Sequence, residues 1–356
     1  KEGKTRQQLG REAFLARVNA FVRDSQGRIH TQMRKLGASC DWSRERYTLD
    51  SGLSRAVSTA FVRLYEQGLI YRGFRIVHWC PSCHSTLSDD EVEYQEQKTK
   101  FYYFKYGPVV IGTARPETKF LDKTIVVHPD DEHYRHLVGK EMDVEWIEGK
   151  VRANVIADSV VDRDFGSGAM TITPAHSFED FDLAQKHHLP VVQIIDEDGN
   201  FTSAAGSFAS KNARQSRDAI VAKLRAKGLV DRIDDHYVHN LSVCYRCGTH
   251  VEPLPSVQWF VNVSAKRKVQ SAKLGYPRRE ASLKELAGWV VKSGKIGIIP
   301  ERFTKTYFHW IDNLRDWCIS RQIWFGHRIP VWYKKSVKRK TQSEKEKEEI
   351  YVGVEP

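Results

Sequence analysis

The sequence predicts an α/β fold in which a compact mixed module interrupts a mainly helical chain. Apolar residues recur at helical spacing within the first 70 residues. Short strand-like segments, separated by Gly, Pro and Asp turns and interrupted by two helical patterns, run from Phe101 to about Val243. Helical and loop patterns return after that point. These three observations indicate a module inserted between two flanking parts.

The first part of the chain contains two helical patterns and one extended segment. The weaker pattern consists of Phe14, Val18, Phe21 and Val22. The stronger pattern forms one apolar face from Leu53, Val57, Ala60, Phe61, Leu64 and Tyr65. Asp50 or Ser51 can cap the N-terminus of the second helix, and Gly68 stands where a left-handed C-terminal cap belongs. The extended segment 69–79 then leads to Cys80.

The inserted module combines short strands with helices, and one further helix follows it. Strands are predicted at residues 102–106, 109–111, 125–128 and 151–156, and helices at residues 178–187 and 213–227. The helix after the module carries Leu283, Leu286, Ala287, Val290 and Val291 and ends at Gly294. Residues 334–349 are almost wholly polar or charged, which predicts a solvated loop.

Composition and charge narrow the class of protein. The 356 residues are 40% hydrophobic and 28% charged, which is ordinary for a soluble protein of two or three domains. A net charge of +11 favours an anionic partner, of which nucleic acid is the commonest, although a solubilising surface bias remains the alternative. Because there is neither a bilayer-length apolar run nor a signal-peptide core, we expect no membrane partner and a cytoplasmic location.

Four of the six cysteines form two Cys-x-x-Cys pairs. They are Cys80, Cys83, Cys244 and Cys247. Two such turns supply four thiolates, the tetrahedral set that a structural zinc ion prefers, and the site would clip the base of the inserted module. Reduced pairs without metal, or a redox dithiol, are the alternatives. His84 and His250 are reserve ligands, whereas Cys40 and Cys318 are predicted to be ordinary buried thiols.

A first polar cluster follows a predicted strand at residues 112–118. It packs two hydroxyls, a guanidinium and a carboxylate together, from Thr113, Arg115, Glu117 and Thr118. Such groups could bind a phosphate, a hydroxyl or a carbonyl oxygen of a ligand. The alternative is a satisfied turn followed by a helix cap, and spacing alone does not separate the two.

A second polar cluster lies at residues 165–180. Thr171 and Thr173 alternate with apolar residues, so both hydroxyls are predicted on one side of a strand. Gly166 and Gly168 would allow a ligand to approach the backbone closely. Asp180 stands in the first turn of the predicted helix, where it either caps the helix or holds a cationic amine of a substrate.

These clusters and two longer segments resemble one family. Residues 36–46 (LGASCDWSRER), 113–118, 166–180 and 313–330 are similar to the bacterial-type valyl-tRNA synthetases, which are class I aminoacyl-tRNA ligases. The resemblance implies a Rossmann-like catalytic domain, split by an editing domain that hydrolyses mischarged tRNA. Residues 1–99 would be part of the catalytic domain with the first zinc knuckle, 100–243 the editing insertion, and 244–356 the second knuckle and the return to the catalytic domain.

The resemblance also assigns roles to residues of both clusters. Asp180 would bind the α-ammonium of the substrate and, with Thr113 and Thr118, form the catalytic set. The substrate-binding set would be Arg115, Glu117, Thr171, Thr173 and Phe325. Phe325 stands where related enzymes usually carry tryptophan in the amino-acid pocket. The implied partners are the acceptor end of valine-specific tRNA, valine and threonine, and the implied assembly is a monomer.

The family needs an editing reaction for a physical reason. Threonine is nearly isosteric with valine, and valyl-tRNA synthetase itself is the known case in which an apolar pocket rejects the extra hydroxyl by only about 10²-fold. A second site that recognises the hydroxyl removes the error by hydrolysis. We expect direct attack by a positioned water, since the sequence shows no nucleophilic Ser or Cys with a partnered base. His176 is a conceivable base, but a structural histidine is favoured.

The chain departs from the family pattern in its nucleotide signatures. A His-Ile-Gly-His-like motif before Arg11 and a Lys-Met-Ser-Lys-Ser-like motif after Pro330 are both missing from this sequence. We therefore expect an internal piece of a longer synthetase, with ATP and magnesium used only by the full-length enzyme and editing retained at most. A non-catalytic tRNA-binding zinc module is the alternative, and a hydrolase unrelated to tRNA is disfavoured by the basic charge.

Overall fold

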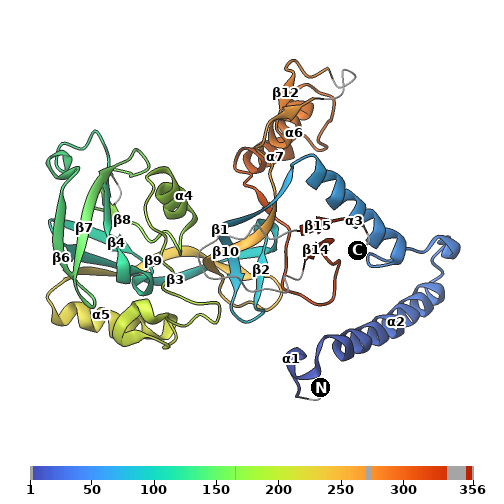
Figure 1. Ribbon diagram of the computed structural model, residues 1–356, viewed down its shortest axis with the longest axis horizontal. Helices are drawn as coiled ribbons and strands as arrows, with labels where there is room; N and C mark the ends of the chain where they lie inside the picture. Colours follow the sequence, from blue (N-terminus) through green and yellow to red (C-terminus); the bar gives the residue numbers. More distant parts are fainter. Residues whose placement is uncertain (1–2, 165, 270–274, 335–349, 355–356) are drawn as a thin grey trace. The chain divides into compact units, whose positions relative to one another are not determined.

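The computed structural model describes residues 3–164, 166–269, 275–334 and 350–354 (Figure 1). The chain forms two compact units, which we call unit 1 (Lys1–Tyr71 with Trp259–Pro356) and unit 2 (Arg72–Gln258). It passes from unit 1 into unit 2 within strand β1 (Ile70–Cys80) and returns within strand β10 (Glu252–Val261). The predicted mixed α/β class is confirmed.

Unit 1 is mainly helical. Its helices are α1 (Arg6–Leu9), α2 (Arg11–Lys35), α3 (Ser51–Glu66), α6 (Leu283–Lys292) and α7 (Phe303–Asp312), with a 3₁₀ turn at Trp42–Arg44. Its short strands are β11 (Arg267–Lys268), β12 (Glu280–Ala281), β13 (Trp317–Cys318), β14 (Val331–Tyr333) and β15 (Ile350–Val352). Antiparallel ladders join β10 to β13, β11 to β12 and β14 to β15. The core of the unit gathers Phe61, Ile70, Trp259, Val261, Val263 and Val331.

Helix α3 follows the sequence prediction at both ends. The carboxylate of Asp50 accepts the backbone N–H of Leu53 at 2.8 Å, which satisfies a donor that the first turn leaves free. Gly68 has φ +67° and donates its N–H to the carbonyl of Tyr65, so the left-handed cap is confirmed. Phe61 on the apolar face packs edge-on against Trp259, with ring centroids 5.7 Å apart. Helix α2 is longer than its predicted pattern, and none of its described side chains is buried.

Unit 2 contains most of the β structure. Its strands are β2 (Ser85–Leu87), β3 (Val92–Tyr106), β4 (Val109–Thr113), β5 (Thr124–Val127), β6 (Glu141–Trp146), β7 (Gly149–Ala157), β8 (Ala169–Thr171) and β9 (Val230–Cys244). Its helices are α4 (Phe178–Lys186) and α5 (Arg217–Ala226). Its 3₁₀ turns are Asp89–Glu91, Pro116–Leu121, Arg135–Leu137, Ser203–Phe208 and Arg214–Ser216.

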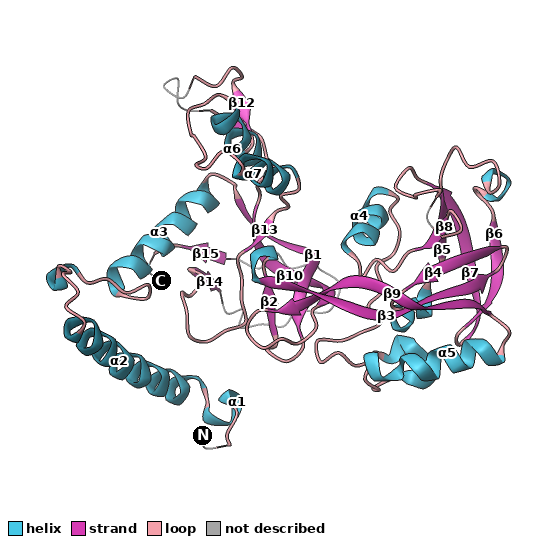
Figure 2. Ribbon diagram, turned by 180° about the vertical axis from the view of Figure 1, so that it is seen from behind, coloured by secondary structure: helices cyan, strands magenta, loops and turns pink. Residues whose placement is uncertain are grey.

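Two sheets enclose the core of unit 2, as the magenta strands of Figure 2 show. One sheet has the order β4-β3-β9 and is antiparallel throughout. The other has the order β6-β7-β5-β8, in which β5 and β7 run parallel. Large fully buried side chains fill the space between the elements, among them Phe104, Tyr106, Trp146, Ile125 and Leu224. Burial of this apolar surface is the main stabilising contribution to the unit.

Strands β3 and β9 form a long antiparallel ladder. Its register pairs Val92 with Cys244 at one end and Phe104 with Val230 at the other, with two irregularities between. The first half of β3 is largely exposed, and β9 is a mixture of exposed and half-buried residues up to its last two positions, so neither sequence shows a clear alternation of apolar and polar residues. The ladder and the cysteine turns belong to unit 2, which is therefore wider than the module predicted at 100–243.

Several local predictions need correction. Helix α5 begins at Arg217, because residues 214–216 form a 3₁₀ turn in place of its first turn. The β5–β8 ladder ends at the pair Ile125–Thr171, so strand β8 ends at Thr171 and Thr173 lies beyond the ladder. Cys40 is exposed in the loop after α2, whereas Cys318 is buried as predicted. Phe165 and nearly all of the predicted loop at 334–349 lie outside the described residues.

No helix of the described ranges combines the length and the apolar character that a bilayer span requires.

Candidate functional site

The first polar cluster forms a tight turn after strand β4. Thr113 is the last residue of β4, and its hydroxyl oxygen accepts the backbone N–H of Arg115 at 2.9 Å. Pro116 begins the 3₁₀ turn Pro116–Leu121, where its missing N–H costs nothing. The hydroxyl of Thr118 donates to the carbonyl of Arg115 at 3.0 Å. The hydroxyls of both threonines are thus used within the turn, and both side chains are almost wholly buried.

The charged members of this cluster join a buried ion-pair network. Glu117 is fully buried and accepts two hydrogen bonds from Arg217 of α5, at 2.7 and 2.6 Å. Arg115 contacts Glu117 at 3.2 Å and also pairs with Glu252 of β10. Burial alone would raise the pKa of Glu117, but Arg115 and Arg217 outweigh it and hold the pKa below its usual value. The turn is therefore clamped between helix α5 and strand β10.

Removing Arg217 should destabilise unit 2 strongly. In Arg217→Ala the carboxylate of Glu117 stays buried but loses a bidentate partner, which should lower the free energy of unfolding by about 3–5 kcal/mol. Chemical denaturation followed by fluorescence measures this change. Arg152→Ala is the matched control, because Arg152 pairs with two carboxylates on the exposed surface and should cost only about 0–1 kcal/mol. Equal losses in the two variants would contradict the buried clamp.

The second polar cluster supplies two separate hydrogen-bonding groups. Thr171 donates its hydroxyl to the carboxylate of Asp122, which Lys119 also approaches at 3.1 Å. Beyond the strand, the carboxylate of Asp180 accepts the backbone N–H of Thr173 at 2.7 Å and lies 3.2 Å from its hydroxyl. Burial raises the pKa of Asp122 to about 6 against the opposing charge of Lys119. Thr171 and Thr173 therefore form hydrogen bonds with different carboxylates, those of Asp122 and Asp180.

The fold brings the two polar clusters together. The guanidinium of Arg115 reaches the carbonyl oxygen of His176 at 3.4 Å. The ammonium of Lys119 donates to the carbonyl oxygen of Thr171 at 3.1 Å. Asp180 opens helix α4 next to this contact, with its own N–H capped by Ser177 at 3.2 Å. Segments that are about 60 residues apart in the sequence thus share one region of unit 2.

His176 is locked by backbone hydrogen bonds. Its Nε2 accepts the backbone N–H groups of Ile194 and Ile195 at 3.0 and 3.2 Å, which assigns the proton to Nδ1, facing the carbonyl of Pro253 at 3.3 Å. Burial, together with the charge of Arg115, lowers the pKa of His176 to about 3. Both ring nitrogens are occupied, so the favoured interpretation of a structural histidine holds and a general base is excluded.

Part of this network was not predicted from the sequence. Arg217 and Glu252 hold Arg115 and Glu117 in place, and Lys119 with Asp122 forms the buried pair beneath Thr171. Glu252 could have been predicted from the sequence, because it is the one charged residue in the apolar segment VEPLP and a buried carboxylate there needs a cationic partner. Arg217 had none, because only the fold brings α5 to the turn. Phe325 belongs to unit 1, where it is half-buried in a loop.

The two Cys-x-x-Cys turns meet at the end of the β3–β9 ladder. The sulfur atoms of all four cysteines lie within 4.8 Å of one another, and the Sγ of Cys247 is 3.5 Å from those of Cys80 and Cys83. Each turn is closed by a backbone hydrogen bond to the carbonyl of its first cysteine, from His84 and from Gly248. A Zn–S length of about 2.3 Å requires tetrahedral sulfur atoms about 3.8 Å apart. The cluster therefore fits one metal ion.

The neighbouring histidines lie outside this cluster. The Nε2 of His84 faces the carboxylate of Asp198 at 3.3 Å. Within the described residues, only the four cysteines form a group with metal-ligand geometry, so His84 and His250 are not needed as ligands. Burial raises the pKa of Cys80 to about 11, which favours the thiol over the thiolate until a cation binds.

Comparison with known proteins places the chain among its relatives. A family model described as tRNA synthetases class I (I, L, M and V) matches residues 1–355. The valine–tRNA ligase of Geobacter sulfurreducens is 44% identical over 339 residues, covering 93% of this chain and 36% of the relative. Those of Streptomyces coelicolor (46% over 337 residues, 94% and 36% coverage) and Thermotoga maritima (43% over 340 residues, 93% and 37% coverage) are similarly related. The chain spans little more than a third of the length of these relatives.

Proposed function

We propose that this chain, which belongs to the class I tRNA synthetases (I, L, M and V), is part of a valine–tRNA ligase. Curated valine–tRNA ligases match more than nine-tenths of the chain at 43–46% identity. In this proposal the whole enzyme joins valine to its tRNA with ATP and magnesium. The contribution of the chain is the editing reaction of unit 2, which releases threonine from mischarged tRNA. A monomeric, cytoplasmic enzyme remains our expectation.

The contact between the two polar clusters is the observation that carries the editing proposal. Asp180 offers a carboxylate to the α-ammonium of the aminoacyl group, next to Thr173, which is only partly buried. The side chain of Arg115 is partly exposed, and in the proposal its guanidinium contacts the terminal adenosine or the ester carbonyl. Glu117 has no exposed surface, so its role in the proposal is to position Arg115. Thr113 and Thr118 shape the turn that presents that guanidinium.

The proposed reaction is hydrolysis of the aminoacyl ester. A water oxygen attacks the carbonyl carbon, the bond from that carbon to the ribose oxygen breaks, and a proton from the attacking water passes to that oxygen, which leaves as the ribose hydroxyl. The products are threonine and free tRNA. Asp180 orients the substrate through its ammonium, and Arg115 stabilises negative charge on the ester oxygen. His176 takes no part, because both of its ring nitrogens are engaged.

Zinc in the cysteine cluster is the structural part of the proposal. Cys80, Cys83, Cys244 and Cys247 match the number and chemistry of ligands in closed structural zinc sites. Val92 pairs with Cys244 at the start of the ladder. A bound ion would therefore hold strands β3 and β9 together at this end. The ion would supply stability to unit 2 and no chemistry to the ester.

A deacylation assay with the whole 356-residue chain tests the editing function. We expect release of radiolabelled threonine from threonyl-tRNA specific for valine to exceed release of valine from the cognate ester by about 10- to 100-fold. A preference of this size is expected if one or two buried hydrogen-bonding groups of the protein pair with the threonine hydroxyl and stay unpaired when valine is bound. Each unpaired group costs about 1–3 kcal/mol.

Measuring tRNA binding in parallel separates the alternative. Binding without hydrolysis would favour a non-catalytic zinc module that holds tRNA. Equal release of valine and threonine would contradict editing.

A further inference from the structure

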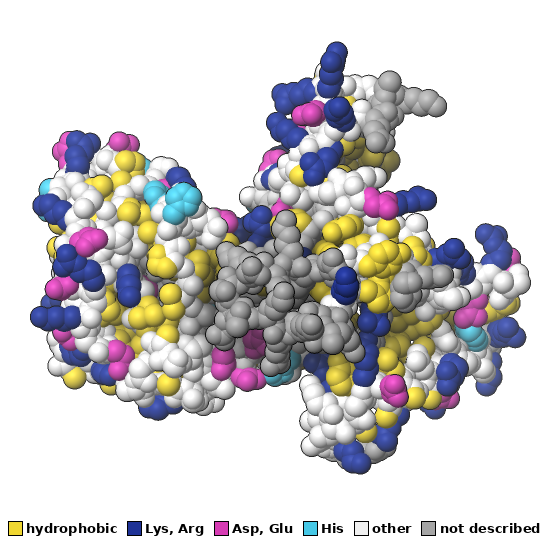
Figure 3. All heavy atoms as spheres, in the orientation of Figure 1, with side chains coloured by type: hydrophobic (Ala, Val, Ile, Leu, Met, Phe, Trp, Pro, Cys, Tyr) yellow, Lys and Arg dark blue, Asp and Glu magenta, His cyan; other side chains and the backbone are white. Residues whose placement is uncertain are grey.

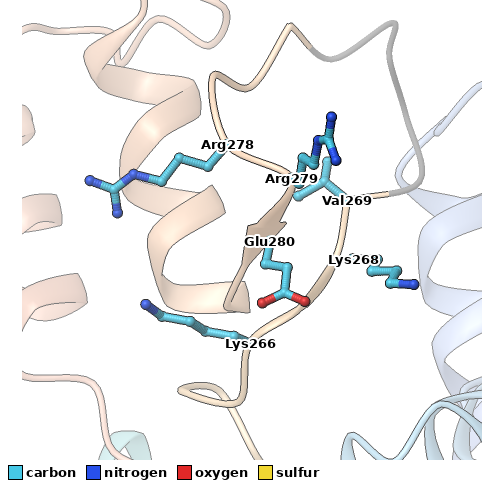
Figure 4. Close-up of a pocket in the computed structure, with 6 residues that line it drawn as sticks. All are labelled: Lys266, Lys268, Val269, Arg278, Arg279 and Glu280. Carbon is cyan, nitrogen blue, oxygen red and sulfur yellow. The ribbon is translucent and has the colours of Figure 1, made fainter.

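A cationic ribbon lies in unit 1, outside the unit that carries the candidate editing site. We use this name for the paired strands β11 and β12 with five cationic residues in or beside them, namely Lys266, Arg267, Lys268, Arg278 and Arg279. Four of these cations, with Val269 and Glu280, line a cavity of about 730 Å³ (Figure 4). Figure 3 shows Lys and Arg side chains gathered on the part of unit 1 around β12 and α6. The proposed editing reaction uses none of these residues.

The cationic ribbon is fixed to the body of unit 1 by Arg267. The guanidinium of Arg267 donates to the carbonyl oxygens of Gln67 and Gly68 at 3.1 and 2.8 Å, just after helix α3. The two strands pair through Arg267 with Ala281 and through Lys268 with Glu280. One cation therefore anchors the ribbon, and the others are presented on a defined backbone.

The remaining charges differ in how far they are neutralised. Lys266 and Arg278 lie 3.9 and 4.0 Å from the carboxylate of Glu285, which is in the first turn of helix α6. Lys268 and Arg279 are exposed, and among the described residues neither has a carboxylate within ion-pair distance. Among the described residues, Glu285 is the carboxylate that pairs with members of the cationic ribbon, and Glu280 is the carboxylate that lines the cavity with them. The excess positive charge is available to an external anion.

The directions of the side chains indicate what kind of anion fits. In Figure 4, Lys266 and Arg278 extend toward one side of the hairpin, Lys268 toward the opposite side, and Arg279 away from both. These groups do not converge on one point, as a pocket for a single phosphate would require. Separate charges along a ribbon suit an extended polyanion with phosphates at regular spacing. Val269 is the one apolar residue of the lining, so the surface lacks the apolar area that membrane binding requires.

We propose that the cationic ribbon binds the phosphate backbone of RNA, as a contact additional to the one at the candidate editing site. This inference rests on the proposed function, because that function supplies tRNA as the natural polyanion. The contact is electrostatic and independent of sequence, with Lys268 and Arg279 as its principal donors. Its purpose is to hold the RNA body while unit 2 acts on the acylated end.

The salt dependence of RNA binding tests the ribbon. We would measure fluorescence anisotropy of labelled tRNA and of an unrelated RNA hairpin over a series of KCl concentrations. For Lys268→Gln/Arg279→Gln, the slope of log K against log[salt] should become shallower by about 2, or about 1 for each phosphate that the protein no longer neutralises. Both RNAs should weaken alike. The charge-conserving Lys268→Arg/Arg279→Lys variant should keep the wild-type slope.

The matched control removes the same charge elsewhere in unit 1. Arg23→Gln/Lys305→Gln changes two exposed cations on α2 and α7 and should leave the slope near its wild-type value. The proposal is refuted if the salt slope of Lys268→Gln/Arg279→Gln equals that of the wild type or of this control. It is also refuted if the wild type binds neither RNA. Saturation of the site by inorganic phosphate at matched ionic strength would refute it as well. Circular dichroism confirms that the exposed substitutions preserve the fold.

Deacylation by the same proteins separates this inference from the editing function. If threonine is released but the salt slopes of all variants coincide, the ribbon fails and editing stands. If no threonine is released but the slope of the Lys268→Gln/Arg279→Gln variant alone is shallower, editing fails and the ribbon stands.

Discussion

Asp180→Asn is expected to slow the release of threonine from threonyl-tRNA by about 10- to 100-fold, while the protein stays folded. The reduced rate follows from removing a charge-assisted hydrogen bond to the substrate ammonium, worth about 1.5–3 kcal/mol. The fold should survive because the amide oxygen of asparagine can still accept the N–H and hydroxyl of Thr173, as the carboxylate does now. Single-turnover deacylation measures the rate, and thermal melting checks the fold.

Two further variants sharpen this test. Asp180→Ala should abolish hydrolysis and also destabilise unit 2 by about 1–3 kcal/mol, since the partly buried N–H and hydroxyl of Thr173 lose their acceptor. Asp182→Asn removes an exposed carboxylate from the same helix and should keep the wild-type rate. Unchanged turnover in Asp180→Asn would show that the carboxylate serves only the helix and the Thr173 loop.

Cys244→Ala is expected to empty the cysteine cluster and destabilise unit 2. Protein purified under reducing conditions without chelator should contain one zinc ion per chain, and the variant should contain far less. Structural zinc contributes about 10–16 kcal/mol in small zinc-finger peptides. Loss of even about 3 kcal/mol would lower the unfolding midpoint of a unit of this size by about 6–12 °C. Elemental analysis and melting curves measure both effects.

Cys318→Ala is the matched control for this experiment. Cys318 is also buried but belongs to unit 1 and is not a member of the cysteine cluster, so the variant loses a buried sulfur without losing a ligand. Its zinc content should equal that of the wild type. A wild-type protein that contains no zinc, or whose melting is indifferent to chelator, would contradict the metal site.

Local signals in the sequence were sufficient for some elements. The cap residues Asp50 and Gly68 predicted both ends of α3, because capping depends on side chains and dihedral angles within a few residues. The two cysteine turns were predicted from spacing alone, and the structure brings their sulfur atoms together. The start of α4 at residue 178 was also predicted, and Ser177 caps it in the structure.

Other features depended on contacts between distant segments. Most of strand β9 was missed because an exposed strand has no apolar face, and its stability comes from pairing with β3 over a long sequence separation. The pairing of Glu117 with Arg217 was invisible for the same reason, since the two residues are about 100 positions apart. The polar residues of the candidate site could be predicted from the sequence. That some of them hold the turn after β4 in place became apparent only from the fold.

The meeting of the two cysteine turns has a consequence for the order of assembly. About 160 residues separate Cys83 from Cys244, and closing a flexible loop of that length costs about 4–5 kcal/mol in chain entropy. During synthesis on the ribosome the second turn emerges only after all the intervening strands and helices of unit 2. The first pair of thiols therefore has no partner pair until unit 2 has been synthesised. A complete four-thiolate site would form only after the whole unit has been made and folded.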